Sequence, residues 1–300
     1  MKRCKGCAFL IVLTLLIAAC APQETIRPTP PPPTIAPKPA KIALVLGAGA
    51  SRGFAHIGVL KVLEANKIPF HMIFGTSAGS FVGSLSAYGF NGFQLQKMAL
   101  ALQKSDLVDY AIPDNGFIKG ERLEEYLNKT VKNTPLEKFR IPFYAIATRI
   151  PSGEEVVFSQ GNAGIAVRAS CSIPGVFRPT RIAGKMYVDG GVVSPLAIDA
   201  ARRYGADIVL AVDISADLDL RPPEGTIDTI LQSINIMYAK LASAQLPRAE
   251  VVIKPKVGHI GSSDVDKRHE AIMEGEKAAL EAMPAIQNII VKLRQEGRLE

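Results

Sequence analysis

The chain has 300 residues, 48% of them hydrophobic, and a formal net charge of +7 from 35 basic and 28 acidic side chains. The positive excess is small and forms no dense basic block, so we expect no nucleic-acid partner. The same charge is compatible with work beside anionic lipid. Residues 41–300 are ample for one large α/β domain.

Residues 1–19 form a predicted signal peptide. Basic residues at the start precede an apolar run, Ala8 to Ala19, which is too short to span a bilayer as a permanent helix. The run ends in Leu16-Ile-Ala-Ala-Cys20, which resembles the bacterial lipobox, where the cysteine is lipidated and becomes the new N-terminus. The alternative is an ordinary cleavage site beside an unmodified cysteine. Loss of this leader removes three positive charges and leaves +4 of the original +7.

The segment from 20 to 40 is a predicted tether between lipid and body. It contains eight prolines, including Pro30 to Pro33, and such a composition favours extended polyproline II. Twenty residues at about 3.1 Å each reach roughly 60 Å. Ala21 follows the cysteine, and the sorting rule that the lipobox resemblance implies then favours the outer membrane. We therefore expect a bacterial membrane lipoprotein in the outer membrane, facing the periplasm.

The body alternates strand and helix patterns along its whole length. Apolar runs predict strands at 41–46, 71–75, 141–148, 156–158, 186–189, 208–213 and 251–254. Helical spacing of apolar residues predicts helices at 53–66, 78–88, 92–104, 120–132, 162–169, 195–204, 227–246 and from about 265 onward. Continuous apolar strands separated by helices predict a mostly parallel sheet covered on both faces.

The segment Gly75-Thr-Ser77-Ala-Gly79 reads G-x-S-x-G between a predicted strand and a predicted helix. That context is typical of a nucleophile elbow, a tight turn with small flanking residues that leaves the serine hydroxyl clear at the strand end. The helix N-terminus behind it favours developing negative charge. The alternative is a plain strand-to-helix turn.

A glycine-rich loop, Gly47 to Gly53, follows the first strand directly and has two interpretations. As a dinucleotide loop it would bind a pyrophosphate at a helix N-terminus. However, its glycines at 47, 49 and 53 miss the G-x-G-x-x-G spacing, and no acidic residue ends the second strand. As an oxyanion hole it would point backbone N–H groups at a carbonyl oxygen that gains charge. Its position beside the strand that ends in Ser77 favours this second interpretation.

Asp189, in the segment Asp189-Gly190-Gly191, is the candidate base for Ser77. A serine nucleophile needs a base within hydrogen-bond reach, and two glycines allow a close approach. An α/β-hydrolase triad with His259 or His269 fits the chain order, but that fold places more strands before its elbow than the two predicted here. A dyad without histidine is the simpler hypothesis.

Four segments together resemble the patatin-like phospholipases over roughly residues 41–215. They are the loop from Leu46 to Leu60, the Ser77 elbow, the run Ala169-Ser-Cys-Ser-Ile-Pro-Gly-Val-Phe177, and Val188 to Pro195. The resemblance implies a three-layer α/β/α fold, a Ser77–Asp189 dyad, and no catalytic metal or cofactor. It also implies that the loop is the oxyanion hole, formed by Ala48, Gly49, Ala50, Arg52 and Gly53.

One departure concerns this loop, which usually reads G-G-G-x-R/K-G in the family. Ala48 and Ala50 stand at its first and third glycines. Alanine still supplies a backbone N–H, so we expect the hole to survive. A cost arises if either position needs φ > 0, where a Cβ is penalised.

The resemblance implies a serine acyl hydrolase of the phospholipase A or lysophospholipase type, acting on a phospholipid, lysophospholipid or other lipid ester. The alternatives are a catalytically weak, membrane-tethered scaffold, a lipid acyltransferase and a nucleotide-binding protein. Loop 105–118 is apolar for a connection, so it is either a lid or interfacial contact, or buried packing. Cys171, the one cysteine outside the leader and lipobox, is expected to be a packing residue with no disulfide partner.

Overall fold

The computed structural model describes residues 37–112, 115–217 and 222–300. The predicted signal peptide, Cys20 and the tether up to residue 36 lie outside the described residues. The body, Pro37–Glu300, is one compact unit.

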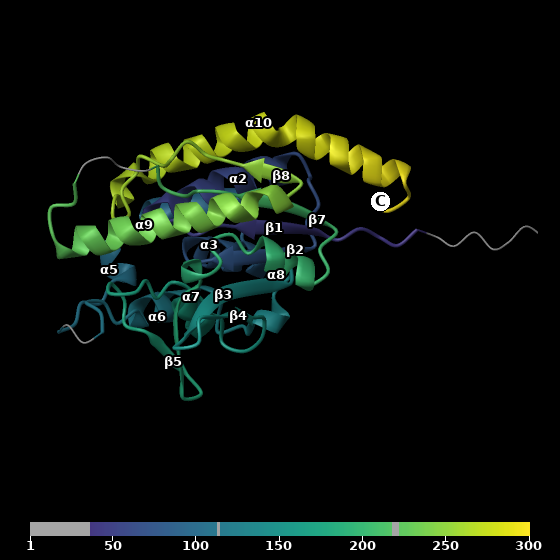
Figure 1. Ribbon diagram of the computed structural model, residues 1–300. Coiled ribbons are helices and arrows are strands. Elements are labelled where there is room, and N and C mark those ends of the chain that lie inside the picture. Colours follow the sequence, from purple (N-terminus) through teal and green to yellow (C-terminus); the bar gives the residue numbers. More distant parts are fainter. Residues whose placement is uncertain (1–36, 113–114, 218–221) are drawn as a thin grey trace, which may run out of the picture. The chain divides into compact units, whose positions relative to one another are not determined.

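A central sheet carries the body, with its strands in the order β5-β6-β3-β2-β1-β7-β8 and β4 paired to β3 (Figure 1). Strands β1, β2, β3, β7 and β8 are mutually parallel, β4 and β6 run antiparallel to β3, and β5 forms a hairpin with β6. The bounds are β1 Ile42–Leu46, β2 Met72–Thr76, β3 Phe143–Ile150, β4 Glu154–Phe158, β5 Thr180–Ile182, β6 Lys185–Asp189, β7 Ile208–Val212 and β8 Val251–Ile253. The prediction of a mostly parallel sheet is confirmed.

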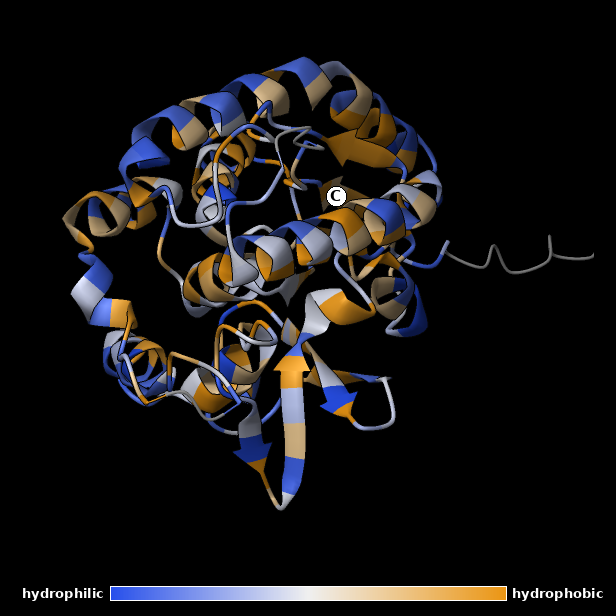
Figure 2. Ribbon diagram, turned by 60° about the vertical axis from the view of Figure 1, so that its left-hand side comes forward, coloured by the Kyte–Doolittle hydropathy of each residue, from blue (hydrophilic) through white to orange (hydrophobic). Residues whose placement is uncertain are grey.

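Helices connect the strands and cover the sheet. They are α2 Phe54–Ala65, α3 Ala78–Tyr88, α4 Gly92–Ala101, α5 Lys104–Leu107, α6 Glu121–Thr130, α7 Ala163–Ser170, α8 Ile198–Arg203, α9 Thr226–Gln245 and α10 Arg268–Gln295. Short 3₁₀ turns lie at η1 Ala50–Gly53, η2 Leu136–Lys138, η3 Gly190–Val192, η4 Leu246–Arg248 and η5 Val265–Lys267. Hydrophobic and hydrophilic residues alternate along the long helices, as expected where one side of a helix is buried (Figure 2).

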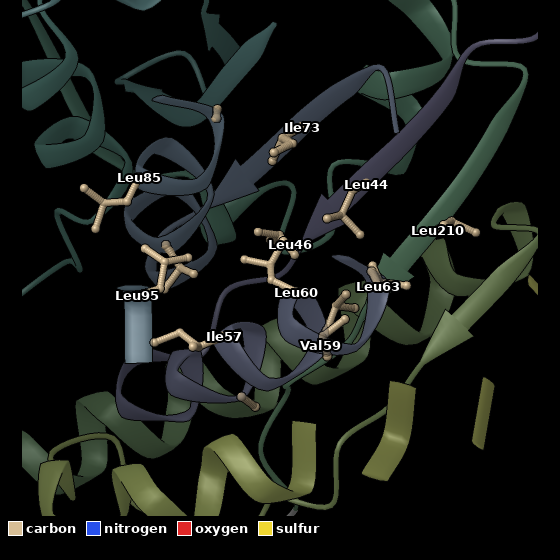
Figure 3. Packing of buried hydrophobic residues seen from close by; sticks show 14 of the residues in the cluster. Leu44, Leu46, Ile57, Val59, Leu60, Leu63, Ile73, Leu85, Leu95 and Leu210 are labelled. Atoms are coloured by element: carbon tan, nitrogen blue, oxygen red, sulfur yellow. The ribbon is translucent and has the colours of Figure 1, made fainter. Parts of the chain in front are cut away.

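Alternate residues of each strand point to opposite faces of the sheet, so the strands contribute to two cores, and helices cover both faces. On one face, Leu44 and Leu46 of β1 pack with Leu60 of α2, and the same core includes residues of α3, α4 and α10 (Figure 3). On the other face, Ala43 and Val45 join the core formed with α8 and the C-terminal half of α9. The structure is therefore the three-layer α/β/α fold that the sequence predicted.

The predicted elements are confirmed with small shifts at their ends. The helix predicted at 195–204 begins at Ile198, because the Pro195 carbonyl accepts from Ala48 and the Leu196 N–H donates to Gln245. The sequence missed β5 and α5, since runs of three and four residues carry too little periodicity to detect. Among the described residues, none of the helices combines the length and apolar character needed to span a membrane.

Candidate active site

Ser77 lies on a strained turn between β2 and α3. Its backbone has φ 55° and ψ −123°, outside the regions that non-glycine residues normally occupy. A Cβ on Gly75 would stand 2.5 Å from the Gly79 carbonyl oxygen, and one on Gly79 would stand 2.0 Å from the Leu46 carbonyl oxygen. Backbone crowding therefore explains why the residues at both ends of the G-x-S-x-G segment are glycines.

The turn brings Ser77 to Asp189, a residue 112 positions away in sequence. The Ser77 hydroxyl donates to Oδ2 of Asp189 at 2.5 Å, and the Gly191 N–H donates to Oδ1 at 2.7 Å. Asp189 ends β6 and is fully buried, while Ser77 is 3% exposed. A Cβ on Gly190 would lie 2.3 Å from the Ile146 carbonyl oxygen, so this position needs glycine for close packing against β3.

Burial raises the pKa of Asp189 to about 6, and hydrogen bonding from Ser77 and Gly191 opposes part of that rise. A carboxyl group with this pKa is ionised in most molecules at neutral pH. It is also more basic than an ordinary aspartate, as a general base must be.

Three hydroxyl-bearing residues, not singled out from the sequence, hold this pair in place. The Ser77 N–H donates to the Ser170 hydroxyl at 3.0 Å. The Asp189 N–H donates to the Ser172 carbonyl at 2.9 Å, and the Thr148 hydroxyl donates to the Asp189 carbonyl at 3.0 Å. Ser170 and Ser172 belong to the Ala169–Phe177 run that carries the family resemblance, and that run was the available signal.

The glycine-rich loop joins β1 to α2 through η1, and its amides divide into two groups. Ala48 donates to the Pro195 carbonyl, Ser51 to the Ser262 carbonyl and Arg52 to the Gly49 carbonyl. Among the described residues, the Gly49 and Ala50 amides have no acceptor. These two N–H groups are the ones available to a bound oxygen.

The conformation of the loop shows which alanine is costly. Ala50 has φ 48°, whereas Ala48 has no positive φ. A Cβ on Gly49 would lie 2.6 Å from the Ile214 side chain and 2.9 Å from its carbonyl oxygen. The cost anticipated for the alanines therefore falls on Ala50 alone.

Arg52 braces the loop from behind. Its Nε donates to the Ile214 carbonyl, Nη1 to the Ile260 carbonyl and Nη2 to the Asn235 side chain. Burial lowers the pKa of Arg52 to about 10, and Asp217 and Asp213 oppose that shift. The guanidinium thus ties the loop to α9 and to the segments after β7 and β8. Gly53 packs against Ala78, where a Cβ would lie only 2.6 Å from the alanine methyl.

None of the histidines, all of which the structure describes, is hydrogen-bonded to Ser77 or Asp189. His56 is fully buried with Nε2 2.9 Å from the Gly47 carbonyl, and burial lowers its pKa to about 4. It is therefore neutral and donates to that carbonyl. His259 lies 2.7 Å from Glu270 on the surface, and His71 accepts from the Ile42 N–H. The geometry favours the dyad over a histidine triad.

An apolar cavity of about 630 Å³ opens beside Ser77. It extends between α3, α4, α6 and the N-terminal half of α9, and Lys104 and Asp228 are the charged side chains among its lining residues. Leu107, Val108 and Phe117 of loop 105–118 line it, while Ile112 is 86% exposed. The described apolar side chains of this segment are half-buried or exposed, so buried packing does not describe it, and a lid or interfacial contact stays a prediction. The volume falls in the range of small-molecule sites.

Cys171 is buried beside the elbow, and its thiol donates to the Ser77 carbonyl at 3.2 Å. Burial raises its pKa well above the usual range, so the thiol stays protonated. Within the described ranges, no three histidine, cysteine, aspartate or glutamate side chains are grouped to hold a metal ion.

The fold and site define a three-layer α/β protein with a serine on a strand-to-helix elbow, an aspartate as its partner and a glycine-rich loop beside them. The profile of the family described as "Patatin-like phospholipase" matches residues 44–202, more than half of the chain. The chain belongs to the patatin-like phospholipase family.

Known proteins show similarity over larger parts of the chain. It is 29% identical over 293 residues to a protein named "Lysophospholipase NTE1" from Pyricularia oryzae, with 86% of this chain and 19% of that protein covered. Against the protein of the same name from Coccidioides immitis, identity is 32% over 241 residues, covering 76% of this chain and 15% of that protein. The chain thus spans less than a fifth of the length of these relatives.

Two further matches extend the comparison. An "Uncharacterized NTE family protein" of Mycobacterium bovis is 33% identical over 178 residues, covering 58% of this chain and 49% of that protein. Among solved structures, VipD from Legionella pneumophila superposes with a TM-score of 0.54 at 14% identity, covering 84% of this chain and 67% of that chain. At this identity the VipD match shows a shared fold.

Proposed function

We propose that this chain is a serine acyl hydrolase that releases fatty acid from phospholipids or lysophospholipids. The observation that carries the proposal is the Ser77–Asp189 hydrogen bond beside an apolar cavity. Membership of the patatin-like phospholipase family and the names of the two fungal relatives support the same chemistry.

In the proposed mechanism Asp189 accepts the proton of Ser77 while the serine oxygen attacks the ester carbonyl carbon. Asp189 passes that proton to the alkoxide of the alcohol part, which leaves as an acyl-enzyme forms. Water then attacks the acyl-enzyme and loses a proton to the freed Asp189, which returns it to the Ser77 oxygen as the fatty acid is released. Asp189 suits this role because burial has raised its basicity while it remains ionised at neutral pH.

The oxyanion would be bound by the free amides of Gly49 and Ala50, aided by the N-terminus of α3. The apolar cavity would hold the acyl chain, since two charged side chains among so many apolar ones leave few partners for a polar group. Arg52 would act by holding the loop, because each of its three guanidinium nitrogens already has an oxygen partner.

We further propose that the protein acts at a membrane to which lipidated Cys20 anchors it, in the bacterial outer membrane facing the periplasm. The lipobox-like sequence and the proline-rich tether that follows it support this part of the proposal. Radiolabelled palmitate fed to expressing cells should enter the wild-type protein. It should not enter a Cys20→Ala variant.

The test of the activity measures fatty-acid release from phosphatidylcholine and lysophosphatidylcholine vesicles by the full chain with a chelator present. Wild type, Ser77→Ala, Asp189→Asn and His259→Ala are compared. We expect both dyad variants to lose at least about 10³-fold in kcat, because a nucleophile and its base act as one unit. The His259→Ala variant should keep full activity.

Other outcomes would redirect the proposal. Loss of activity in His259→Ala would point to a triad. Acyl products other than free fatty acid would indicate acyl transfer. No Ser77-dependent labelling by a fluorophosphonate probe, together with no lipid turnover, would favour a non-catalytic scaffold.

A further inference from the structure

Tyr238, on α9, lies against both the glycine-rich loop and the segment that follows Asp189. It is 6% exposed and packs with Ala48 of the glycine-rich loop and Ile234. A Cβ on Gly191 would lie 2.3 Å from its Cζ and 2.8 Å from its hydroxyl oxygen. The phenol therefore rests directly on the backbone that follows Asp189.

The Tyr238 hydroxyl is an unusual polar group for a protein interior. It is buried and has no hydrogen-bond partner among the described residues. A buried hydroxyl without a partner destabilises the folded state, so such a group calls for an explanation. A phenylalanine would fill the same space without that cost.

The neighbours of the hydroxyl suggest its partner. Tyr238 lowers the pKa of the Asp189 carboxyl as a hydrogen-bond donor would, although its hydroxyl forms no hydrogen bond to the described residues. In return, burial first and then the negative charge of Asp189 raise the pKa of Tyr238 well above its ordinary value. The phenol therefore stays protonated and able to donate.

Few other groups compete for the carboxylate. Ser77 donates to it from the elbow and the Gly191 N–H from η3, while Cys171, from the segment after α7, adds a protonated thiol nearby. Thr148 of β3 reaches the Asp189 carbonyl instead of the carboxylate. None of the described groups that shift the pKa of Asp189 is a lysine, arginine or histidine.

We propose that Tyr238 is a positioning residue that donates a hydrogen bond to ionised Asp189 and keeps its carboxylate available as the base for Ser77. The bond forms by a small rotation of the carboxylate or phenol as Asp189 becomes charged. It weakens when Asp189 takes the serine proton. This inference rests on the proposed dyad chemistry, and it adds α9 to the elements that control the dyad.

The variant that isolates the hydroxyl is Tyr238→Phe in the full chain, with Tyr144→Phe as the matched control. Tyr144 is a partly buried tyrosine of β3 that stacks on Phe74, and Asp189 is not among the groups that shift its pKa. The first measurement is the pH profile of kcat/KM for lysophosphatidylcholine hydrolysis. In Tyr238→Phe the acid limb of the profile should move to higher pH. Below that limb kcat/KM should fall about 3- to 10-fold, and at high pH it should return to the wild-type value. KM should stay unchanged.

A second measurement follows Asp189 without turnover. The carboxyl carbon of Asp189, labelled with ¹³C and assigned by its absence in Asp189→Asn, is titrated in both tyrosine variants. We expect a higher midpoint in Tyr238→Phe and an unchanged one in Tyr144→Phe. That shift in a chain without lipid turnover would support Tyr238 while refuting the proposed function.

Two results would overturn the inference. One is an Asp189 midpoint that Tyr238→Phe does not change. The other is an equal loss of kcat at every pH together with a lower Tm, which would mark Tyr238 as a packing residue.

Discussion

The serine elbow and the glycine-rich loop both hold a non-glycine residue at positive φ, but for different reasons. At the elbow, Ser77 with φ 55° supplies the hydroxyl that reaches Asp189. In the loop, Ala50 with φ 48° supplies a methyl group at a position where glycine would serve as well. Strain at the elbow places the Ser77 hydroxyl beside Asp189, whereas strain at Ala50 places no functional group.

The two alanines of the loop also differ from each other. Ala48 lies in ordinary backbone geometry, and its methyl packs with Ile234 and Tyr238. Ala50 carries the positive φ. A departure from a motif therefore has to be judged position by position, from the backbone conformation at each residue.

The largest expected effect is on the elbow, from Gly79→Ala. The new methyl would lie 2.0 Å from the Leu46 carbonyl oxygen, so β1 and α3 would have to separate. We expect a loss of about 3 kcal/mol in the free energy of unfolding, the upper end of the usual cost of overpacking, measured by urea denaturation. Gly83→Ala, in the same helix, meets side-chain atoms at 3.1–3.2 Å and is the control, with a much smaller expected change. Equal stability of the two variants would contradict the crowding explanation.

The second prediction concerns the partner of the elbow and its dependence on pH. The folded-state pKa of Asp189 is about 6, above the ordinary value of 3.8, so protonation stabilises the folded state relative to the unfolded state. That stabilisation is complete below about pH 4 and is lost as pH rises to 6. At pH 7 the buried charge costs roughly 3 kcal/mol.

Asp189→Asn should therefore raise Tm at pH 7 and change it little at pH 4, while it abolishes turnover. The Asp199→Asn variant, a change at a partly exposed carboxylate of α8 that pairs with Arg248, is the control and should not raise Tm at pH 7. The same Tm difference at both pH values would show that Asp189 carries no buried charge.

The smallest expected effect is on the loop, from Ala50→Gly. Relief of a left-handed alanine is worth about 1–2 kcal/mol, and the added backbone freedom of glycine takes back about 0.5–1 kcal/mol. We expect a net gain of between zero and about 1.5 kcal/mol in the free energy of unfolding, and an equal or higher kcat. Ala48→Gly, where no strain is relieved and packing is lost, should lose about 0.5–1 kcal/mol. A gain in both variants would mean that the loop prefers glycine regardless of φ.

Much of the candidate site could be predicted because its parts are local in sequence. Ser77 lies within a five-residue motif, and Asp189 is followed directly by two glycines. The geometry brings these two residues together as the dyad hypothesis required. Ser170 and Ser172 were within a recognised run, but their contacts to the backbone of Ser77 and Asp189 depend on how α7 packs. No sequence pattern connected Tyr238 with the site, since its spacing on α9 is that of any buried helical residue.

The sequence by itself determined the alternation of strands and helices, the strand-to-helix position of the elbow and the glycines that crowding requires. These follow from periodicity and backbone sterics, which act over a few residues. Only the tertiary structure decided which amides remain free, which alanine is strained, where Arg52 directs its nitrogens and that a tyrosine of α9 faces Asp189. Those features arise where segments far apart in the chain meet, and burial there changes the charge and hydrogen bonding of each group.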